Sequence, residues 1–88
     1  MVKASVEIES ETGLHARPAT EIAKIAMKYN CDVNLIVNGK RINAKSPLMI
    51  MAAGIKSKTE LEIQCDGEDE EKALEELETV FRNQLSEA

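Results

Sequence analysis

The dipeptide Asn38-Gly39 lies between two short segments of alternating polarity, and it predicts a tight β-hairpin. These two residue types most readily adopt the positive φ angles of a type I′ turn. Residues 31–37 have Cys, Val, Leu and Val at their odd positions, which predicts a strand that buries its odd positions. Residues 41–44 predict the returning strand. An antiparallel sheet is therefore the framework within which the rest of the chain must fold.

Two further segments alternate with the same period of two residues. Residues 2–8 are apolar at even positions, and residues 61–65 are apolar at odd positions. Each pattern predicts a strand with one buried face and one face in water. The chain thus contains four predicted strands, two of them joined by the hairpin.

Three helices are predicted between and after these strands. The apolar stripe of the first follows helical spacing, and we expect its members to be buried: Ala19, Ile22, Ala23, Ala26 and Met27. This helix begins at Ala16 or at Pro18. A residue before proline is disfavoured in helices, but proline is tolerated in a first turn, and we favour a start at Ala16.

The second and third predicted helices have clear end signals. Ser46 is an N-cap before Pro47, and Gly54 follows the helix end, so the second helix has about two turns. The acidic run 66–71 begins the third, where the helix dipole favours negative charge. Its apolar stripe is Ala73, Leu74, Leu77, Val80, Phe81 and Leu85.

The element order βαββαβα predicts an α+β fold, an open-faced β-sandwich. Its four-stranded antiparallel sheet has three helices on one face, because clean alternation leaves the other face to water. Placing the fourth strand between the first and second makes every neighbouring pair antiparallel. The 88 residues suit one domain, 1–88.

Composition excludes several classes of function. Acidic residues outnumber basic ones by 16 to 11, and the chain has one Phe, one Tyr and no Trp, which argues against nucleic-acid binding. No apolar run reaches the length of a membrane span, so we expect no membrane insertion and a cytoplasmic protein. We also expect the chain to be a monomer. One histidine and two distant cysteines match no metal spacing, so we expect neither a metal nor a cofactor.

The two cysteines have related positions in the predicted sheet. Cys31 begins the second strand and Cys65 ends the fourth, and both point inward by parity. The two side chains could therefore be close, although we expect reduced core thiols.

The only histidine, His15, lies where a strand pattern stops and a helix pattern begins. The first N–H groups of a helix have no partner inside it, and the helix dipole leaves partial positive charge there. Arg17 adds a planar cation that can grip an oxyanion with two hydrogen bonds. A neutral imidazole beside these donors can accept, hold and pass on a phosphoryl group.

The second predicted helix offers a docking surface. Residues 47–53 contain no polar residue, and a helix on a sheet cannot bury every side of itself. We expect some of Pro47, Leu48 and Met51 to form an exposed apolar patch for a partner, and Met49 and Ile50 to belong to the core. Phosphorylation of Ser46 would add nearly two negative charges beside this patch.

Four segments together resemble the HPr family, the histidine-containing phosphocarriers of the bacterial sugar phosphotransferase system. These segments are Thr12-Gly13-Leu14-His15-Ala16-Arg17-Pro18-Ala19, Asn38-Gly39-Lys40, Asn43-Ala44-Lys45-Ser46 and Gly67-Glu68-Asp69-Glu70. The resemblance implies that His15 accepts a phosphoryl group on Nδ1 from enzyme I, charged by phosphoenolpyruvate, and donates it to sugar-specific IIA domains. Such a carrier is not itself an enzyme, because catalysis resides with its partners.

The resemblance also implies roles for other residues. The Ala16 and Arg17 amides and the Arg17 side chain would bind the phosphoryl group, and Thr12 would help to shape the site. Thr20, Leu48 and Met51 would belong to the partner surface.

Regulation at Ser46 is implied for many family members. There an HPr kinase/phosphorylase modifies this serine, and the product binds a catabolite-control transcription factor. This chain has Pro47-Leu48-Met49 where those members usually have Ile-Met-Gly, and proline removes an N–H there.

Three alternative functions remain open. One is a regulatory interaction module that is modified at Ser46 and binds partners through the apolar patch. Another is a nitrogen-regulatory phosphocarrier with the same His15 chemistry, although Lys45-Ser46 favours the sugar system. A hydrolase fits worst, because no base or second nucleophile accompanies His15 in the sequence.

Overall fold

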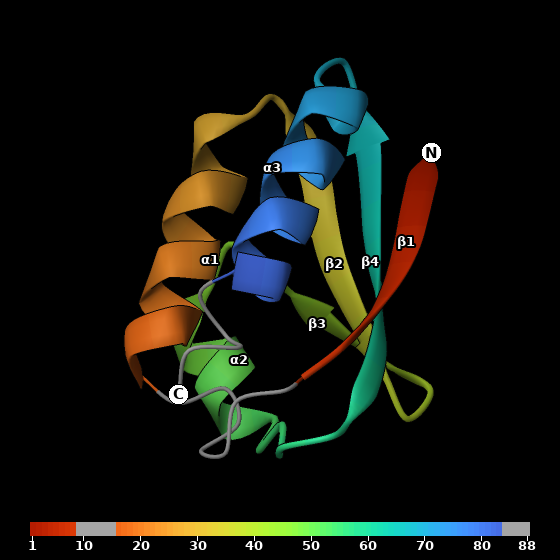
Figure 1. Cartoon of the computed structure of the whole chain (residues 1–88). Coiled ribbons are helices and arrows are strands. Elements are labelled where there is room, and N and C mark those ends of the chain that lie inside the picture. Colours follow the sequence, from red (N-terminus) through yellow and green to blue (C-terminus); the bar gives the residue numbers. More distant parts are fainter. Residues whose placement is uncertain (9–15, 84–88) are drawn as a thin grey trace.

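The computed structural model describes residues 1–8 and 16–83, and Figure 1 shows their arrangement. The elements, in chain order, are β1 (Val2–Glu7), α1 (Ala16–Lys28), β2 (Cys31–Val37), β3 (Lys40–Asn43), α2 (Pro47–Ala52), β4 (Glu60–Gly67) and α3 (Glu70–Asn83). This is the predicted order, and the α+β fold class is confirmed.

The sheet has the predicted strand order, β1-β4-β2-β3, with every neighbouring pair antiparallel. The hairpin between β2 and β3 turns at Asn38 and Gly39, whose φ angles are +51° and +81°. Both angles are positive, as a type I′ turn requires.

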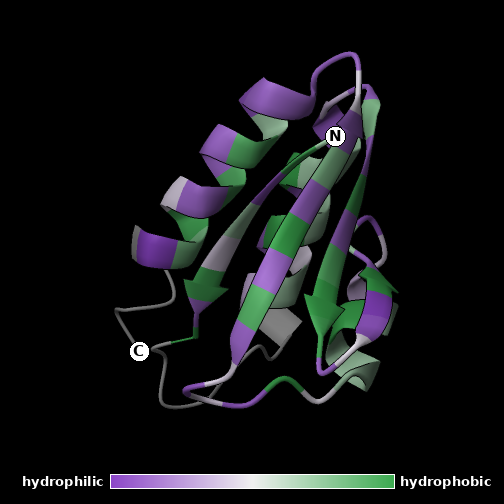
Figure 2. Cartoon of the chain, turned by 90° about the vertical axis from the view of Figure 1, so that its right-hand side faces the viewer, coloured by the Kyte–Doolittle hydropathy of each residue, from purple (hydrophilic) through white to green (hydrophobic). Residues whose placement is uncertain are grey.

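The three helices cover one face of the sheet, and the core lies between the two layers (Figure 1). Hydrophilic and hydrophobic residues alternate along the strands in Figure 2, which agrees with one dry and one wet face. The core is almost wholly aliphatic, and its largest fully buried side chains are Phe81, Ile8, Ile22, Leu35, Ile50, Ile63 and Leu77.

Helix α1 begins at Ala16, as we favoured, but its buried stripe differs in one residue. Met27 is 57% exposed, so its predicted burial is wrong, whereas Ile25 is buried. Ile25 lies three residues after Ile22 and occupies the same helix face, while Met27 turns toward solvent.

Helix α2 begins after Ser46 and is followed by Gly54 in the left-handed region, as predicted. The predicted burial of Met49 is wrong, since its side chain is 48% exposed while Ile50 is fully buried. Successive helical residues are turned by about 100°, so this short helix, which packs against α1 and β3, buries Ile50 while Met49 faces solvent.

The acidic run before α3 is a set of specific contacts rather than only a solvated helix start. Asp69 Oδ2 accepts a hydrogen bond from the Asn30 backbone N–H at 2.9 Å, and Glu68 accepts one from the Asn30 side-chain amide. The chain's N-terminal ammonium lies 3.4 Å from Glu70 and 3.7 Å from Asp66. These contacts join the α1–β2 and β4–α3 connections at one end of the sheet.

The two cysteines lie close together in the core, on neighbouring strands. Cys65 is opposite Val33 and Cys31 is opposite Gly67, so the two thiols are diagonal neighbours in the β2–β4 ladder. Both are buried and free. Burial, with a smaller effect of the Cys31 thiol, raises the pKa of Cys65 to about 12.

Neither a membrane helix nor a metal cluster is found in the described ranges. None of the helices there has both the length and the apolar character needed to cross a bilayer. In the same ranges, no three His, Cys, Asp or Glu side chains are grouped as metal ligands.

Candidate functional site

The candidate site begins at the first turn of α1. Because α1 starts at Ala16, the backbone N–H groups of Ala16 and Arg17 belong to the turn that has no partners inside the helix. Pro18 has no N–H, so these two amides are the first donors at the positive end of the dipole. His15 precedes Ala16 directly in the chain. His15 and Thr12 lie outside the described residues, as does the side chain of Arg17.

The first turn of α1 is anchored in the core. Pro18 and Ala19 are both buried, while Thr20 is exposed. Burial on one side and exposure on the other hold the helix start in a defined orientation at the surface. The donors of this turn are therefore positioned by packing rather than by local preference alone.

Helix α2 packs directly against α1, so the two predicted parts of the site are brought together (Figure 1). Leu48 is 75% exposed and Met49 is 48% exposed. We call these two residues the α2 patch. Pro47 and Met51 are half-buried at its border, and Met51 packs against the core. The expectation of an exposed apolar surface on this helix is therefore confirmed, with Met49 added to it.

Ser46 holds the start of α2. Its Oγ accepts a hydrogen bond from the Met49 backbone N–H at 3.3 Å, and its backbone carbonyl accepts one from Ile50 at 3.2 Å. The Asn43 side chain accepts a hydrogen bond from the Lys45 backbone N–H at 3.0 Å, which orders the approach to the cap. Ser46 is half-buried and lies two residues before Leu48.

Charge is divided between two parts of the chain, a feature that the total of −5 conceals. Residues 16–58, which form α1, β2, β3 and α2, contain eight Lys or Arg and two Asp or Glu. Residues 59–83, which form β4 and α3, contain two Lys or Arg and ten Asp or Glu. The start of α1 and the α2 patch thus belong to the basic part, and counting charge by segment would have found this.

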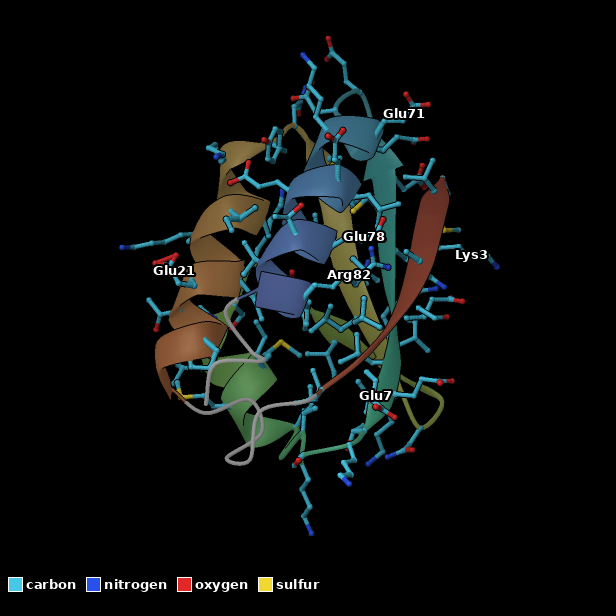
Figure 3. The ribbon with its side chains drawn as sticks, viewed as in Figure 1. Lys3, Glu7, Glu21, Glu71, Glu78 and Arg82 are labelled. Atoms are coloured by element: carbon cyan, nitrogen blue, oxygen red, sulfur yellow. The ribbon has the colours of Figure 1, made fainter. Side chains whose placement is uncertain are left out.

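Two lysines of α1 differ in their surroundings. Lys24 is exposed, four residues after Thr20 on the same helix face. Lys28 instead pairs with Glu76 of α3 at 2.9 Å. The charge of Lys24 is therefore presented to solvent, whereas that of Lys28 is largely used within the fold. Figure 3 shows the charged side chains around the molecule.

The family model described as the phosphotransferase-system HPr component phosphorylation site matches residues 2–83. The chain belongs to the HPr family. This membership makes it a phosphocarrier of the phosphotransferase system. Among sequence relatives, the phosphocarrier protein HPr of Mycoplasma capricolum subsp. capricolum is 44% identical over 75 residues, which cover 85% of this chain and 84% of the relative.

Solved structures of HPr proteins have the same fold. HPr from Thermoanaerobacter tengcongensis superposes with a TM-score of 0.92 at 32% identity, covering 100% of this chain and 99% of that one. The catabolite repression protein Crh of Bacillus subtilis, itself a domain-swapped dimer, has a TM-score of 0.75 at 38% identity, covering 97% and 98%. The family resemblance inferred from the sequence is confirmed.

Proposed function

We propose that His15 accepts a phosphoryl group from enzyme I, derived from phosphoenolpyruvate, and passes it to sugar-specific IIA domains. The observation that supports this most directly is the start of α1 at Ala16, the residue after the histidine. Two backbone donors and the positive end of the helix dipole are then available to an anion held at the imidazole.

The proposed step is an in-line transfer between two histidines. The lone pair of His15 Nδ1 attacks the phosphorus of a phosphohistidine on the donor, and the donor's N–P bond breaks as the new one forms. The proton on the other nitrogen of each ring stays in place, so charge and atoms balance. A helix N-terminus disfavours the imidazolium form and so favours the neutral imidazole, whose free nitrogen lone pair is the nucleophile.

The surrounding groups bind the transferred phosphoryl group. In this proposal the Ala16 and Arg17 amides and the Arg17 guanidinium donate to its oxygens, and Thr12 helps to shape the site. A hydrogen bond to a charged group contributes about 1.5–3 kcal/mol. A few such bonds stabilise the phosphohistidine without trapping it, which suits a carrier that must release its cargo.

Docking supplies the position of the two histidines. The α2 patch, its border residues Pro47 and Met51, and Thr20 form the proposed contact surface. The basic character of residues 16–58 favours partners with acidic docking faces, because complementary charge steers the encounter. One copy of the chain is enough for this exchange, which we place in the cytoplasm.

Ser46 is the proposed regulatory residue. Its hydroxyl caps α2 beside the α2 patch, so a phosphoryl group there would put close to two negative charges at the edge of the docking surface. An HPr kinase/phosphorylase would add it, and a catabolite-control transcription factor would read it. The N1 position of Pro47 leaves the backbone beside Ser46 stiffer than in the family pattern.

The test is phosphorylation by enzyme I with phosphoenolpyruvate and magnesium, read by intact mass and acid lability. We expect an acid-labile gain of one phosphoryl group that is absent in His15→Ala. A second incubation with a IIA domain should return the carrier to its original mass. A folded protein that gains nothing, while a known carrier is charged in parallel, would refute the proposal.

A further inference from the structure

Strand β1 is an edge of the sheet. Within the described residues it pairs with β4 alone, so its other edge has no strand beside it (Figure 1). An edge strand presents unpaired backbone groups that can template pairing with another chain. The free edge of β1 could therefore accept a strand from another chain.

The hydrogen bonds of Ile8, just after β1, show which backbone groups of the strand point toward β4. Ile8 N–H donates to the Thr59 carbonyl at 2.9 Å, and the Ile8 carbonyl accepts from Lys58 N–H. In an antiparallel ladder, alternate residues turn both backbone groups to the same neighbour. The even residues of β1 therefore bond to β4. The backbone groups of Lys3, Ser5 and Glu7 point to the free edge.

We propose that a second copy of this chain pairs with β1 antiparallel, about a two-fold axis at Ser5. In this register Ser5 lies opposite the partner's Ser5, and Lys3 lies opposite the partner's Glu7. Each of these facing pairs can exchange two hydrogen bonds, because both of its residues have outward backbone groups. Figure 3 labels Lys3 and Glu7, which lie toward opposite ends of the strand.

The charges of Lys3 and Glu7 favour the same register as the directions of the backbone groups. Lys3, Ser5 and Glu7 are all exposed on the outer face of the sheet. An axis at Lys3 would place two lysines opposite each other, and an axis at Glu7 would do the same with two glutamates, which is unfavourable. The axis at Ser5 forms two Lys–Glu pairs and uses the whole length of the strand.

The helix-facing side of β1 is consistent with an added strand. Val2 and Ala4 point inward by parity but are only half-buried, whereas Val6 is buried. Val2 also lines a hollow of about 250 Å³ beside Leu74 and Arg82 of α3. In the proposed register Ala4 lies opposite the partner's Val6, so pairing would cover apolar surface that one copy leaves open.

The association is expected to be weak and reversible, because a two-strand contact is smaller than a standard interface. It leaves the α2 patch open, since β1 and β3 are opposite edges of the sheet and α2 packs on the β3 side. The inference therefore stands independently of the proposed function.

Sedimentation equilibrium from micromolar to millimolar concentration, at about 0.15 M salt, tests the charge pairing. Lys3→Glu and Glu7→Lys should each weaken the dimer about tenfold, because each converts two attractive pairs into two repulsive pairs. The double variant restores opposite charges and should return the dissociation constant to near the parent value. A monomer at all concentrations, or a dimer that is equally tight in all four proteins, would overturn the proposal.

Backbone pairing is tested separately by Ser5→Pro and by amide hydrogen exchange. Proline is tolerated on an edge strand where the N–H faces outward, so this variant should keep its fold and lose the dimer. In the parent, the Lys3, Ser5 and Glu7 amides should gain protection with concentration. The Ala4 and Val6 amides should be protected throughout. A folded Ser5→Pro variant that still dimerises, or protection without this alternation, would overturn the register.

Discussion

The Lys28 ammonium, near the end of α1, lies 2.9 Å from each carboxylate oxygen of Glu76 on α3. The neighbouring Tyr29 hydroxyl also donates a hydrogen bond to Glu76. The Lys28 and Tyr29 hydrogen bonds hold the pKa of Glu76 below its usual value, and the Glu76 hydrogen bond raises the pKa of Tyr29. Two side chains from one helix thus converge on one carboxylate of another, and this fixes the two larger helices relative to each other.

Glu76→Gln should lower the melting temperature by a few degrees. The glutamine amide has the same shape as the carboxylate but carries no negative charge to pair with the Lys28 ammonium. It is also a weaker hydrogen-bond acceptor for the Tyr29 hydroxyl. Thermal unfolding followed by circular dichroism measures the change. Glu75→Gln is the matched control, because Glu75 is an exposed neighbour on the same helix and should leave the melting temperature nearly unchanged.

The same contact predicts a pH dependence. Because the folded-state pKa of Glu76 is below its ordinary value of 4.5, the stability that it contributes is complete above that pH and is lost as pH falls through the lower folded value. At the other end, the raised pKa of Tyr29 means that its contribution is complete below pH 10.0 and is lost above it. The free energies of unfolding of the parent and of Glu76→Gln, measured by denaturant titration, should therefore differ most between pH 4.5 and pH 10.0. A constant difference from pH 3 to 7 would contradict this assignment.

Much of this fold follows from local pattern. Alternation, the Asn38-Gly39 turn and the Ser46 cap each act within a few residues, and the antiparallel hairpin then restricts the order of the remaining strands. The residues around His15 also indicate anion chemistry, because a helix start, an imidazole and a guanidinium are adjacent in sequence. Such local signals predict elements and the type of site.

Other features depend on contacts that no local pattern contains. Lys28 and Glu76 are 48 residues apart, so their pairing depends on how the two helices pack. The burial of Met49 was predicted wrongly because residues 47–53 contain no polar residue and therefore no period to orient the helix. Only packing against α1 and β3 selects Ile50 as its buried residue.

Gly67→Ala should destabilise the protein by about 3 kcal/mol, through strain and overlap together. Gly67 has a φ of +150°, and a Cβ there would lie 2.7 Å from both Cα and Cβ of Cys31. Gly54→Ala is the matched control. Its φ is +63° and its Cβ would meet nothing within 4 Å, so we expect a cost of only about 1 kcal/mol. If urea unfolding gave the same loss of unfolding free energy for both variants, the contact with Cys31 would relax freely.

The two thiols should resist alkylation in the folded protein. The thiolate is the reactive form, and burial raises the pKa of Cys65 to about 12 and also raises that of Cys31. Iodoacetamide at pH 8 should therefore modify the native protein far more slowly than the same protein in denaturant, as measured by intact mass. Modification of both thiols at the denatured rate would show that the core opens easily at this end of the sheet.

Substitutions at Ser46 should separate its capping role from its regulation. Ser46→Ala removes the Oγ acceptor of the Met49 N–H and should cost about 1 kcal/mol of stability. It should leave phosphorylation of His15 unchanged. Ser46→Asp keeps an acceptor at the cap, so its stability should stay near that of the parent while its added charge slows phosphoryl transfer. A loss of transfer in Ser46→Ala would show that the cap itself orders the docking surface.

Leu48→Gln should leave stability within about 0.5 kcal/mol of the parent, because the side chain is 75% exposed and packs little within the fold. Its effect should fall on docking, with the concentration needed for half-maximal phosphorylation by enzyme I rising about tenfold. Met27→Gln is the matched control, since Met27 is a comparably exposed apolar residue of α1 outside the α2 patch. It should leave phosphorylation unchanged.

The buried neighbour of Leu48 should behave in the opposite way. Ile50→Ala empties a fully buried position and should cost about 2–5 kcal/mol, with transfer by the remaining folded protein nearly unchanged. Urea unfolding and initial rates of phosphorylation, measured on the same preparations, distinguish a loss of stability from a loss of docking. If Leu48→Gln and Met27→Gln slowed transfer equally, docking would not be centred on α2, because exposed apolar area alone would then account for the effect.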